Sequence, residues 1–510
     1  MLVFHGYLLR GTGSNIYNAS VARALADLEH EVHLLCQDRY AAEHPFVDAV
    51  GEWEGGRLRV RTLREPVRCT VYVPDIGGLL PVYVADRYEG IEAKPFPDLS
   101  EEELERYLAA NVAAVREVAE RARPDVALAN HAVMGPAVLS RALGDRVPYA
   151  VKIHGSALEY TVRRHPDRFL PYAREGLAGA SGVLVGSRHT AESLWEVLAE
   201  PGLRERTRLG PPGVDTAAFR PRPPAEAAAA LRALADRLEG AGGGWGGEAG
   251  ATEALRDLDP ERELIVSYVG KLIVSKGVDL LLAAWPLVAA RVPAARLVVV
   301  GFGEYRDGLA RLLTALAAGD LGAAREVAAR GRELEGGAPG ELHYLAAFLD
   351  GLAGERRAEY EAGARAAAAK VRFTGRLEHD DLPALLCGAQ AQVVPSTFPE
   401  AFGMVAAEAA ACGALPLSAS HSGLAEVTAT LEAALEPELR PLLSFERGAG
   451  AVEEIAQKLV TWLEIDAPRR AAAAAALSAL ARERYGWEGV ARGVIAAAEG
   501  RLDELPEPAA

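Results

Sequence analysis

Residues 395–426 read PSTFPEAFGMVAAEAAACGALPLSASHSGLAE, and they follow the short apolar run AQVV at 391–394. This pattern predicts a strand, a loop and then a helix that is nearly all alanine. Loops that precede helices bind anions, because the first backbone N–H groups are unpaired and the helix dipole favours negative charge. Glu400 and Glu408 would repel a bare phosphate there. They indicate a ligand that carries hydroxyls beside its phosphates, such as a nucleotide-sugar.

Glu400 and Glu408 also have a plainer interpretation. Two isolated glutamates are usually a solvated residue and a helix-stabilising one. The context favours a site, because the helix around Glu408 is otherwise apolar from Ala401 to Ala411. A lone acid in a buried helix costs several kcal/mol unless it is paired. The turn Phe402-Gly403-Met404 would let backbone N–H groups approach a ligand closely.

The bulk properties exclude several classes of protein. The chain has 510 residues, 50% of them hydrophobic, which suggests two to four domains. A net charge of −16 disfavours nucleic acid or an anionic membrane as the main partner. The 4 cysteines are scattered and form no C-x-x-C pair, so they indicate no zinc site and no disulfide framework, and a reducing cytoplasm fits best. The apolar run at the N-terminus is too short for a secretory signal and is expected to form a first strand, and no apolar run is long enough to span a membrane.

Residues 1–220 alternate short apolar runs with helical segments, which predicts a parallel sheet covered on both faces. Helices are expected at Asn15–Glu29 and Glu101–Arg123. Residues 40–98 are irregular and are expected to form an extra hairpin or a lid. The expected strands are Leu2–Phe4, Glu31–Cys36, Asp125–Ala129, Tyr149–Ile153 and Val183–Val185.

The second half of the chain repeats this alternation. Residues 221–260 are rich in glycine and alanine and predict a flexible inter-domain linker. A second sheet domain is expected over 261–465, interrupted at 304–369 by about three alanine-rich helices, and helices form the tail at 466–510. The expected strands are Leu264–Val269, Leu297–Val300, Val371–Thr374, Ala391–Val394 and Ala414–Ser418.

Lys271 and Lys276 lie in the sequence VGKLIVSKGVD, where a buried strand leads into a helix. Two cations at the carboxyl end of a strand could neutralise a diphosphate. The stretch is no P-loop, because G-x-x-x-x-G-K-[ST] is absent. Two solvated lysines beside a turn are the alternative.

Two further candidates lie in the first half. The sequence GTGS at 11–14 resembles part of a dinucleotide fingerprint, but Ile16 stands where a third glycine belongs, and a tight turn explains the glycines equally well. Asp38 after the second strand keeps the dinucleotide interpretation open. His154 ends an apolar strand before Gly155, where functional residues gather, although a structural histidine is as good an explanation.

Taken together, these motifs resemble one family, the retaining GT-B glycosyltransferases of family 4, also called group 1. The resemblance covers about 1–220 and 261–495. It rests on G-T-G-S, K-I-H-G-S, P-P-G-V-D-T-x-x-F, V-G-K-L-x-x-x-K-G, V-V-V-G-F-G, V-R-F-T-G-R-L, E-A-F-G-M-V-x-x-E-A and S-G-L-A-E. It implies an α/β fold of two Rossmann-like, doubly wound domains facing across a cleft, with a helical insertion in the second. Residues 1–220 would bind the acceptor and 261–465 the donor, and the C-terminal helices would cross back to the first domain.

The resemblance also implies residue roles. Lys271 and Lys276 would hold the donor diphosphate, with Lys271 standing where many members have arginine. Glu400 would bind the sugar hydroxyls, and His154 would touch the donor sugar near the reacting carbon. These four are the expected catalytic residues. Donor contacts are expected from Gly11, Gly13, Arg376, Leu377, Phe402, Gly403, Met404 and Glu408, with Glu408 on the ribose, Arg376 and Leu377 beside the base, and Glu426 closing the pocket floor.

The implied activity is transfer of a hexosyl-type sugar from a nucleoside-diphosphate-sugar to an acceptor hydroxyl, with the anomeric configuration retained and no metal or other cofactor. The acceptor would be a glycan, a lipid-linked molecule or a small molecule. The implied location is cytoplasmic, with peripheral contact at the inner face of the membrane left open. A nucleotide-sugar epimerase, a phosphorolytic enzyme or a non-catalytic nucleotide-sugar-binding protein on the same fold are the alternatives. A nicotinamide oxidoreductase would rest on G-T-G-S alone.

Overall fold

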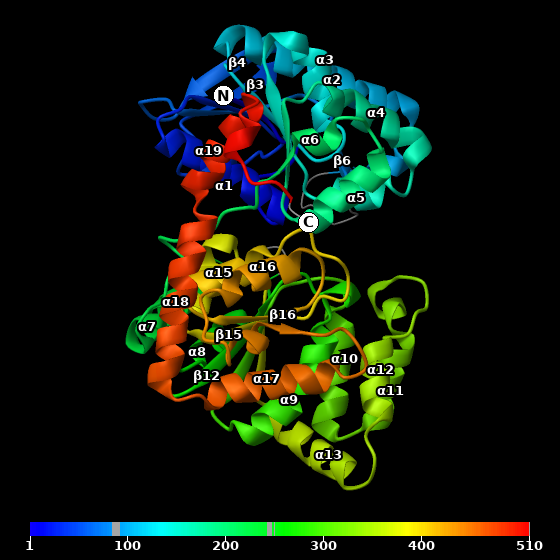
Figure 1. The fold of residues 1–510 in the computed structure, drawn as a ribbon, viewed down its shortest axis with the longest axis vertical. Helices are drawn as coiled ribbons and strands as arrows, with labels where there is room; N and C mark the ends of the chain where they lie inside the picture. The colour runs from blue at the N-terminus through cyan, green and yellow to red at the C-terminus, as the bar shows by residue number, and fades with distance from the viewer. Residues whose placement is uncertain (84–91, 242–246, 249, 509–510) are drawn as a thin grey trace. The chain divides into compact units, whose positions relative to one another are not determined.

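The computed structural model describes residues 1–83, 92–241, 247–248 and 250–508 (Figure 1). The chain divides into two compact units. Unit 1 comprises residues 1–213 together with 485–510, and unit 2 comprises residues 214–484. Each unit is a wholly or mainly parallel sheet with helices around it, which confirms the predicted α/β class.

The sheet of unit 1 has, among the described residues, nine strands in the order β11-β10-β9-β8-β1-β2-β5-β3-β4. Every pair is parallel except β3 with β4. The central strands are buried on both faces, as continuous apolar runs require in a parallel sheet. The bounds are β1 Leu2–Phe4, β2 Val32–Leu35, β3 Ala49–Glu54, β4 Arg57–Thr62, β5 Cys69–Val73, β8 Ala127–Asn130, β9 Tyr149–Lys152, β10 Gly182–Val185 and β11 Thr207–Leu209.

The predicted strands of unit 1 are all present, and the long helix α2 begins where the sequence carries a helix-start signal. Ser100 and Glu103 form a capping box at the start of α2, each side chain accepting a backbone N–H. The helices of unit 1 are α1 Gly13–Asp27, α2 Glu101–Ala122, α3 Gly135–Leu143, α4 Pro166–Ala178, α5 Arg188–Leu198, α6 Leu203–Arg206 and α19 Trp487–Ala498.

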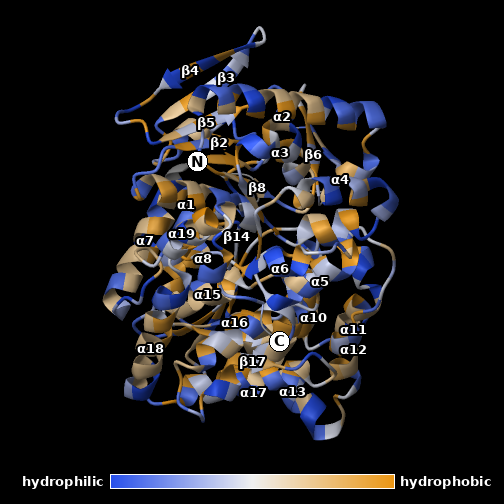
Figure 2. Cartoon of the chain, turned by 45° about the horizontal axis from the view of Figure 1, so that its top comes forward, coloured by the Kyte–Doolittle hydropathy of each residue, from blue (hydrophilic) through white to orange (hydrophobic). Residues whose placement is uncertain are grey.

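The hairpin expected within 40–98 is confirmed as β3 and β4, and it forms one edge of the sheet. Figure 2 shows β4 mostly in the colour of hydrophilic residues, and Arg57, Arg59 and Arg61 alternate along it. Charged side chains on an edge strand oppose pairing with another chain. A separate two-stranded parallel sheet, β6 Leu79–Val82 with β7 Glu92–Pro95, completes this region, and residues 84–91 of it lie outside the described residues.

The last of the described α-helices, α19, belongs to unit 1 and packs tightly there. Trp487 meets the ring of Tyr17 edge-on, with the ring centroids 5.7 Å apart. A Cβ at Gly213 would lie 2.5 Å from the Trp487 ring, and one at Gly182 would lie 2.7 Å from the carbonyl oxygen of Ala497. The two glycines therefore make room for α19.

Unit 2 contains, in its described part, a six-stranded parallel sheet in the order β14-β13-β12-β15-β16-β17. Strand order reverses between β12 and β15, as it does between β8 and β1 in unit 1. In open α/β sheets ligands bind at the carboxyl ends of the strands beside such a switch point. The strands are β12 Leu264–Val269, β13 Ala295–Val300, β14 Val371–Gly375, β15 Ala389–Val394, β16 Leu415–Ala419 and β17 Ser444–Phe445.

The helices of unit 2 include the insertion predicted at 304–369. It lies between β13 and β14 and has four described α-helices where three were expected, because α12 and α13 are separated at Gly351. The helices of unit 2 are α7 Pro224–Ala241, α8 Ala251–Arg256, α9 Val278–Arg291, α10 Arg306–Ala318, α11 Leu321–Arg330, α12 His343–Asp350, α13 Gly354–Ala368, α14 Leu382–Leu386, α15 Met404–Ala411, α16 Ser422–Glu432, α17 Ala451–Glu464 and α18 Ala467–Tyr485.

The range 221–260 differs from the flexible linker that its composition suggested. Two helices, α7 and α8, occupy much of it and group with unit 2. Leu231 and Leu234 of α7 and Leu255 of α8 are each 1% exposed, so both helices are anchored by apolar burial. Residues 242–246 and 249 of this range lie outside the described residues.

Candidate functional site

The carboxyl edge of the sheet in unit 2 brings together the two loops that the sequence singled out. The loop after β12 contacts the loop after β15, where the N–H of Thr397 donates to the carbonyl oxygen of Ser275 at 2.8 Å. Gly277 has φ +65°, and a Cβ there would lie 2.0 Å from the carbonyl oxygen of Pro395. Only glycine fits this close approach of two backbones.

Lys276 and Glu400 meet at this contact. The Lys276 Nζ donates a hydrogen bond to Glu400 Oε1, and the hydroxyl of Ser396 donates to the same oxygen at 2.7 Å. Burial alone would raise the pKa of Glu400, but the charge of Lys276 and the hydrogen bonds from Lys276 and Ser396 hold it below its usual value. The carboxylate is therefore ionised at neutral pH, with a cation beside it.

A second layer of hydrogen bonds orients Glu400, and sequence reasoning missed it. The N–H of Glu400 donates to Ser422 Oγ at 2.9 Å. The His421 Nε2 lies 2.7 Å from the carbonyl oxygen of Ser396, so Nε2 carries the proton, and Nδ1 accepts from the Ser422 hydroxyl at 3.0 Å in the neutral ring. The motif S-G-L-A-E begins at Ser422, and His421 comes directly before it.

The start of α15 offers backbone donors beside this pair. The first intrahelical bonds are those of Ala406 and Ala407, whose N–H groups reach the carbonyl oxygen of Gly403. The N–H groups of Gly403 and Met404 precede them and belong to the orphan donors of a helix N-terminus. The sequence predicted ligand contacts through these backbone groups and through that of Phe402, which directly precedes them.

Glu408 lies deeper in α15 and is 2% exposed. Its Oε1 is 2.8 Å from His379 Nε2, an ion pair that the sequence did not predict. Of the residues expected beside a base, Leu377 is buried, and Arg376 forms an ion pair of 2.8 Å with Glu378. The carbonyl oxygen of Lys271, at the end of β12, accepts the hydroxyl of Tyr268 at 2.8 Å.

In unit 1 the switch point between β1 and β8 carries a buried polar network around Asn130. The Nδ2 of Asn130 donates to the carbonyl oxygen of Phe4 at 3.1 Å and to Asn18 Oδ1 at 2.7 Å, which fixes the orientation of its amide. Its Oδ1 then accepts from His154 Nε2 at 2.8 Å. His154 is therefore the Nε2–H tautomer, and its Nδ1 is an acceptor.

His154 is neutral at physiological pH. Burial, followed by the nearby charges of His131, Lys152 and His5, holds the pKa of His154 well below its usual value. Its surroundings suit a hydrogen-bonding role better than a cationic one.

Gly11 and Gly13 lie at the start of α1, also in unit 1. Gly11 has φ +92°, and Gly13 is the first residue of the helix. Asp38, which a dinucleotide site would use on a ribose, is 3% exposed and accepts the N–H groups of Leu9 at 3.0 Å and Tyr40 at 2.8 Å. Because its carboxylate secures these loops, the nicotinamide interpretation loses its support.

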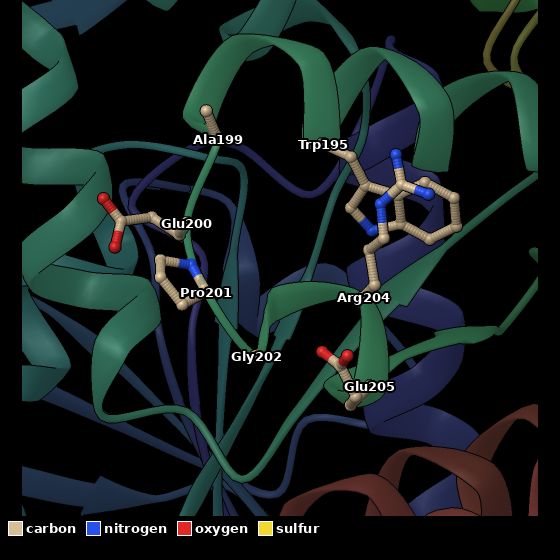
Figure 3. A pocket seen from close by; sticks show the side chains of 7 residues that line it. All are labelled: Trp195, Ala199, Glu200, Pro201, Gly202, Arg204 and Glu205. Carbon is tan, nitrogen blue, oxygen red and sulfur yellow. The ribbon is translucent and has the colours of Figure 1, made fainter.

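A separate surface pocket of unit 1, of about 400 Å³, lies between α5 and α6 and contains none of the predicted residues. Figure 3 shows the guanidinium of Arg204 lying against the Trp195 ring, with its Cζ 4.7 Å from the ring centroid. Glu200 is paired with Arg174 at 2.6 Å. Two charged side chains of this pocket, those of Arg204 and Glu200, are thus already engaged.

Across the described residues, no group of three or more His, Cys, Asp or Glu side chains could hold a metal ion. None of the described helices is long and apolar enough to cross a membrane.

Models of known protein families match residues in both units. The model of the glycosyl transferase 4-like domain matches residues 12–213, and that of the glycosyl transferases group 1 matches residues 346–475. The chain belongs to the group 1 glycosyltransferases. The second match contains the whole of 395–426, so the expectation of a group 1, family 4-type glycosyltransferase is confirmed.

This group 1 glycosyltransferase is 30% identical over 251 residues to D-inositol 3-phosphate glycosyltransferase of Rhodococcus opacus (strain B4). The match covers 49% of the chain and 43% of that protein, so the chain spans less than half the length of the curated relative it matches.

Solved structures share the fold of the whole chain. Sucrose-phosphate synthase of Thermosynechococcus elongatus has a TM-score of 0.58 at 19% identity, covering 99% of this chain and 98% of that one. HepE of Anabaena, solved with UDP-glucose, has a TM-score of 0.55 at 16% identity, with 99% of both chains covered. The catalytic domain of starch synthase IV of Arabidopsis thaliana, bound to ADP and acarbose, has a TM-score of 0.58 at 12% identity, covering 98% of this chain and 99% of that one. These likenesses confirm the GT-B class of fold.

Proposed function

We propose that the chain transfers a sugar from a nucleoside-diphosphate-sugar to an acceptor hydroxyl, with retention of the anomeric configuration and without a metal ion. The observation that carries this proposal is the pairing of Lys276 with Glu400 at the carboxyl edge of the sheet in unit 2, beside the start of α15. A cation, an ionised carboxylate and orphan N–H groups at one place suit a ligand with both phosphates and hydroxyls.

Breaking the bond between the anomeric carbon and the diphosphate leaves negative charge on the phosphate and positive charge on the sugar. Lys276, Lys271 and the N–H groups at the start of α15 stabilise the departing diphosphate. Glu400 accepts hydrogen bonds from the sugar hydroxyls and fixes the position of the ring. His421 and Ser422 hold the Glu400 loop in place through the hydrogen bonds described above.

His154 accepts a hydrogen bond from the donor sugar through Nδ1, since its Nε2 proton is held by Asn130. The new bond forms between the acceptor oxygen and the anomeric carbon on the face that the diphosphate leaves. The acceptor proton passes to a phosphate oxygen of the leaving group. No protein base and no metal ion is needed for this step.

The donor is a hexose carried on a nucleoside diphosphate. UDP-glucose and ADP are the ligands named for structures of the same fold, so uridine and adenosine conjugates are the first to test. The acceptor class is wider and includes glycans, lipid-linked molecules and small polyols. The curated relative acts by name on an inositol phosphate, which makes a phosphorylated polyol a sensible first acceptor.

A panel of radiolabelled nucleotide-sugars, incubated with the protein in the presence of a metal chelator, tests the proposal through release of nucleoside diphosphate. NMR of the product reports the anomeric configuration. An epimerase would convert the sugar without releasing the nucleotide, and a non-catalytic binding protein would leave the donor intact. Absence of nucleotide release with every donor and acceptor, despite binding, would reject the transferase.

A further inference from the structure

The geometry points to His379 as a positioning residue that orients Glu408 toward the ribose hydroxyls of the nucleotide. This inference rests on the proposed function, and it adds a residue that none of the sequence motifs indicated. His379 begins the short 3-10 helix His379–Asp381, which follows β14.

Glu408 needs a partner because of where it lies. It is 2% exposed on a helix whose neighbouring residues Ala406, Ala407, Ala409 and Ala410 are fully buried. An ionised carboxylate in apolar surroundings is costly unless it is paired and hydrogen-bonded. His379 supplies that pairing through Nε2 at 2.8 Å from Oε1.

The contact engages one carboxylate oxygen. A carboxylate accepts about four hydrogen bonds through its two oxygens. With Oε1 held by the imidazole, rotation of the carboxylate is restrained and Oε2 keeps its acceptor capacity. A vicinal diol, which presents two O–H donors at a fixed spacing, suits such a fixed carboxylate.

His379 is itself held in place. Its ring lies 5.2 Å from that of Phe219, measured between centroids. The charged groups that face it are Glu408 from α15, Asp380 from its own helix and Asp215 from the segment before α7. Burial alone would lower the pKa of His379, but the charge and hydrogen bond of Glu408, followed by the charges of Asp380 and Asp215, raise it above its usual value.

These observations give the pair two measurable properties. Removing His379 should weaken binding of nucleotides that carry a ribose diol and spare those that lack it. The preference for the diol should also fall as the pH rises through the pKa of His379, because Glu408 then loses its cationic partner. The comparison of two nucleotides cancels the titration of their phosphates, which they share.

The test uses ADP and UDP, each beside its 2′,3′-dideoxy counterpart, in calorimetric titrations of the full chain between pH 6 and pH 9. The variants are His379→Ala and His379→Gln, whose amide can still donate a hydrogen bond but carries no charge. The matched control is His343→Ala, which removes an exposed His–Glu pair of 3.0 Å with Glu341 in the same unit.

We expect His379→Ala to weaken binding of the ribonucleotide by roughly tenfold, as for loss of a charge-assisted partner in a buried site. The affinity for the dideoxynucleotide should change less than about twofold by the same reasoning, and His343→Ala should change neither affinity. His379→Gln should recover part of the affinity while abolishing the pH dependence of the diol preference.

Equal weakening of both nucleotides by His379→Ala, or a diol preference that keeps its pH dependence in His379→Gln, would overturn the inference and leave the proposed function standing. If the wild-type chain binds neither ADP nor UDP nor any other nucleoside diphosphate, the proposed function fails and the inference with it.

Discussion

Lys276 and Glu400 are hydrogen-bonded to each other although 124 residues separate them in the sequence. One follows β12 and the other follows β15, the two strands at the switch point of the sheet in unit 2. Their side chains are 30% and 24% exposed, so both are reachable from solvent. The residues assigned to the phosphate and to the sugar therefore lie side by side.

Replacing Lys276 with alanine should weaken binding of a nucleoside diphosphate by about 1.5–3 kcal/mol, because a charge-assisted hydrogen bond to the phosphate is lost. Titration calorimetry with UDP and ADP measures this. Lys94→Ala is the matched control, since Lys94 pairs with Glu103 at 2.8 Å with similar exposure of 36% and 26%. Equal effects of the two variants would contradict the phosphate role.

Glu400→Gln should lower kcat by about 100-fold while nucleoside diphosphate affinity changes little, because the group positions the sugar and not the phosphate. The amide keeps the size of the side chain and its ability to accept from Ser396. Steady-state kinetics with the best donor, together with calorimetry of the nucleotide product, separate the two effects. A variant that loses nucleotide affinity but keeps kcat would refute the assignment.

Asn130→Ala and His154→Ala should each lower kcat, and the double variant should be little worse than either alone. The reason is that Asn130 acts by fixing the Nε2–H tautomer of His154, and residues acting as one unit are not additive. Asn111→Ala is the control, because Asn111 is another buried asparagine of unit 1, bonded to the carbonyl oxygen of Tyr107 at 2.8 Å. Additive losses would argue against a shared role.

Lys152 predicts a pH dependence of stability in unit 1. It is 2% exposed, with its Nζ 2.5 Å from the carbonyl oxygen of Gly210, and burial lowers its pKa from 10.5 to about 7. The folded chain therefore binds fewer protons than the unfolded chain between those two values. The free energy of unfolding should rise as the pH increases from 7 to 9, by up to about 2 kcal/mol, and its dependence on this group should level off below pH 7, where the folded and the unfolded chain both carry the proton.

Chemical denaturation of the wild type and of Lys152→Met across this range measures the effect, since the methionine has a similar shape and no proton to lose. The difference between their free energies of unfolding should change by up to about 2 kcal/mol between pH 7 and pH 9, because only the lysine titrates. Lys94→Met, at a half-exposed position, should show no such trend. A pH-independent difference would mean that Lys152 is not buried as a titrating amine.

The sequence predicts the strands well because they are continuous apolar runs that can be buried only in a covered parallel sheet. It fails over 224–241, where glycine and alanine suggest a linker while Leu231 and Leu234, three residues apart, mark the buried face of a helix. The distinction depends on what lies opposite that face, which composition does not report.

In the candidate site, too, some features could be predicted from the sequence and others depend on tertiary contacts. Glu400, Lys276 and the start of α15 follow from residue types at strand and helix ends. The pairing of Glu408 with His379 does not, because it joins two helices through a tertiary contact that no spacing encodes. Likewise His421 and Ser422 become partners of the Glu400 loop only because β15 and β16 are neighbours.

The late return of the chain to unit 1 has a consequence for synthesis on the ribosome. Unit 2 is continuous in sequence, so it can fold as soon as it emerges. Unit 1 is made of two separate segments, residues 1–213 and 485–510, which leave the ribosome at different times. The surface around Tyr17 that Trp487 covers therefore stays exposed until residues 214–484 have been translated. At about 5–20 residues per second this interval is roughly 15–50 s. During that time an apolar surface at the N-terminal part of the nascent protein is open to chaperones.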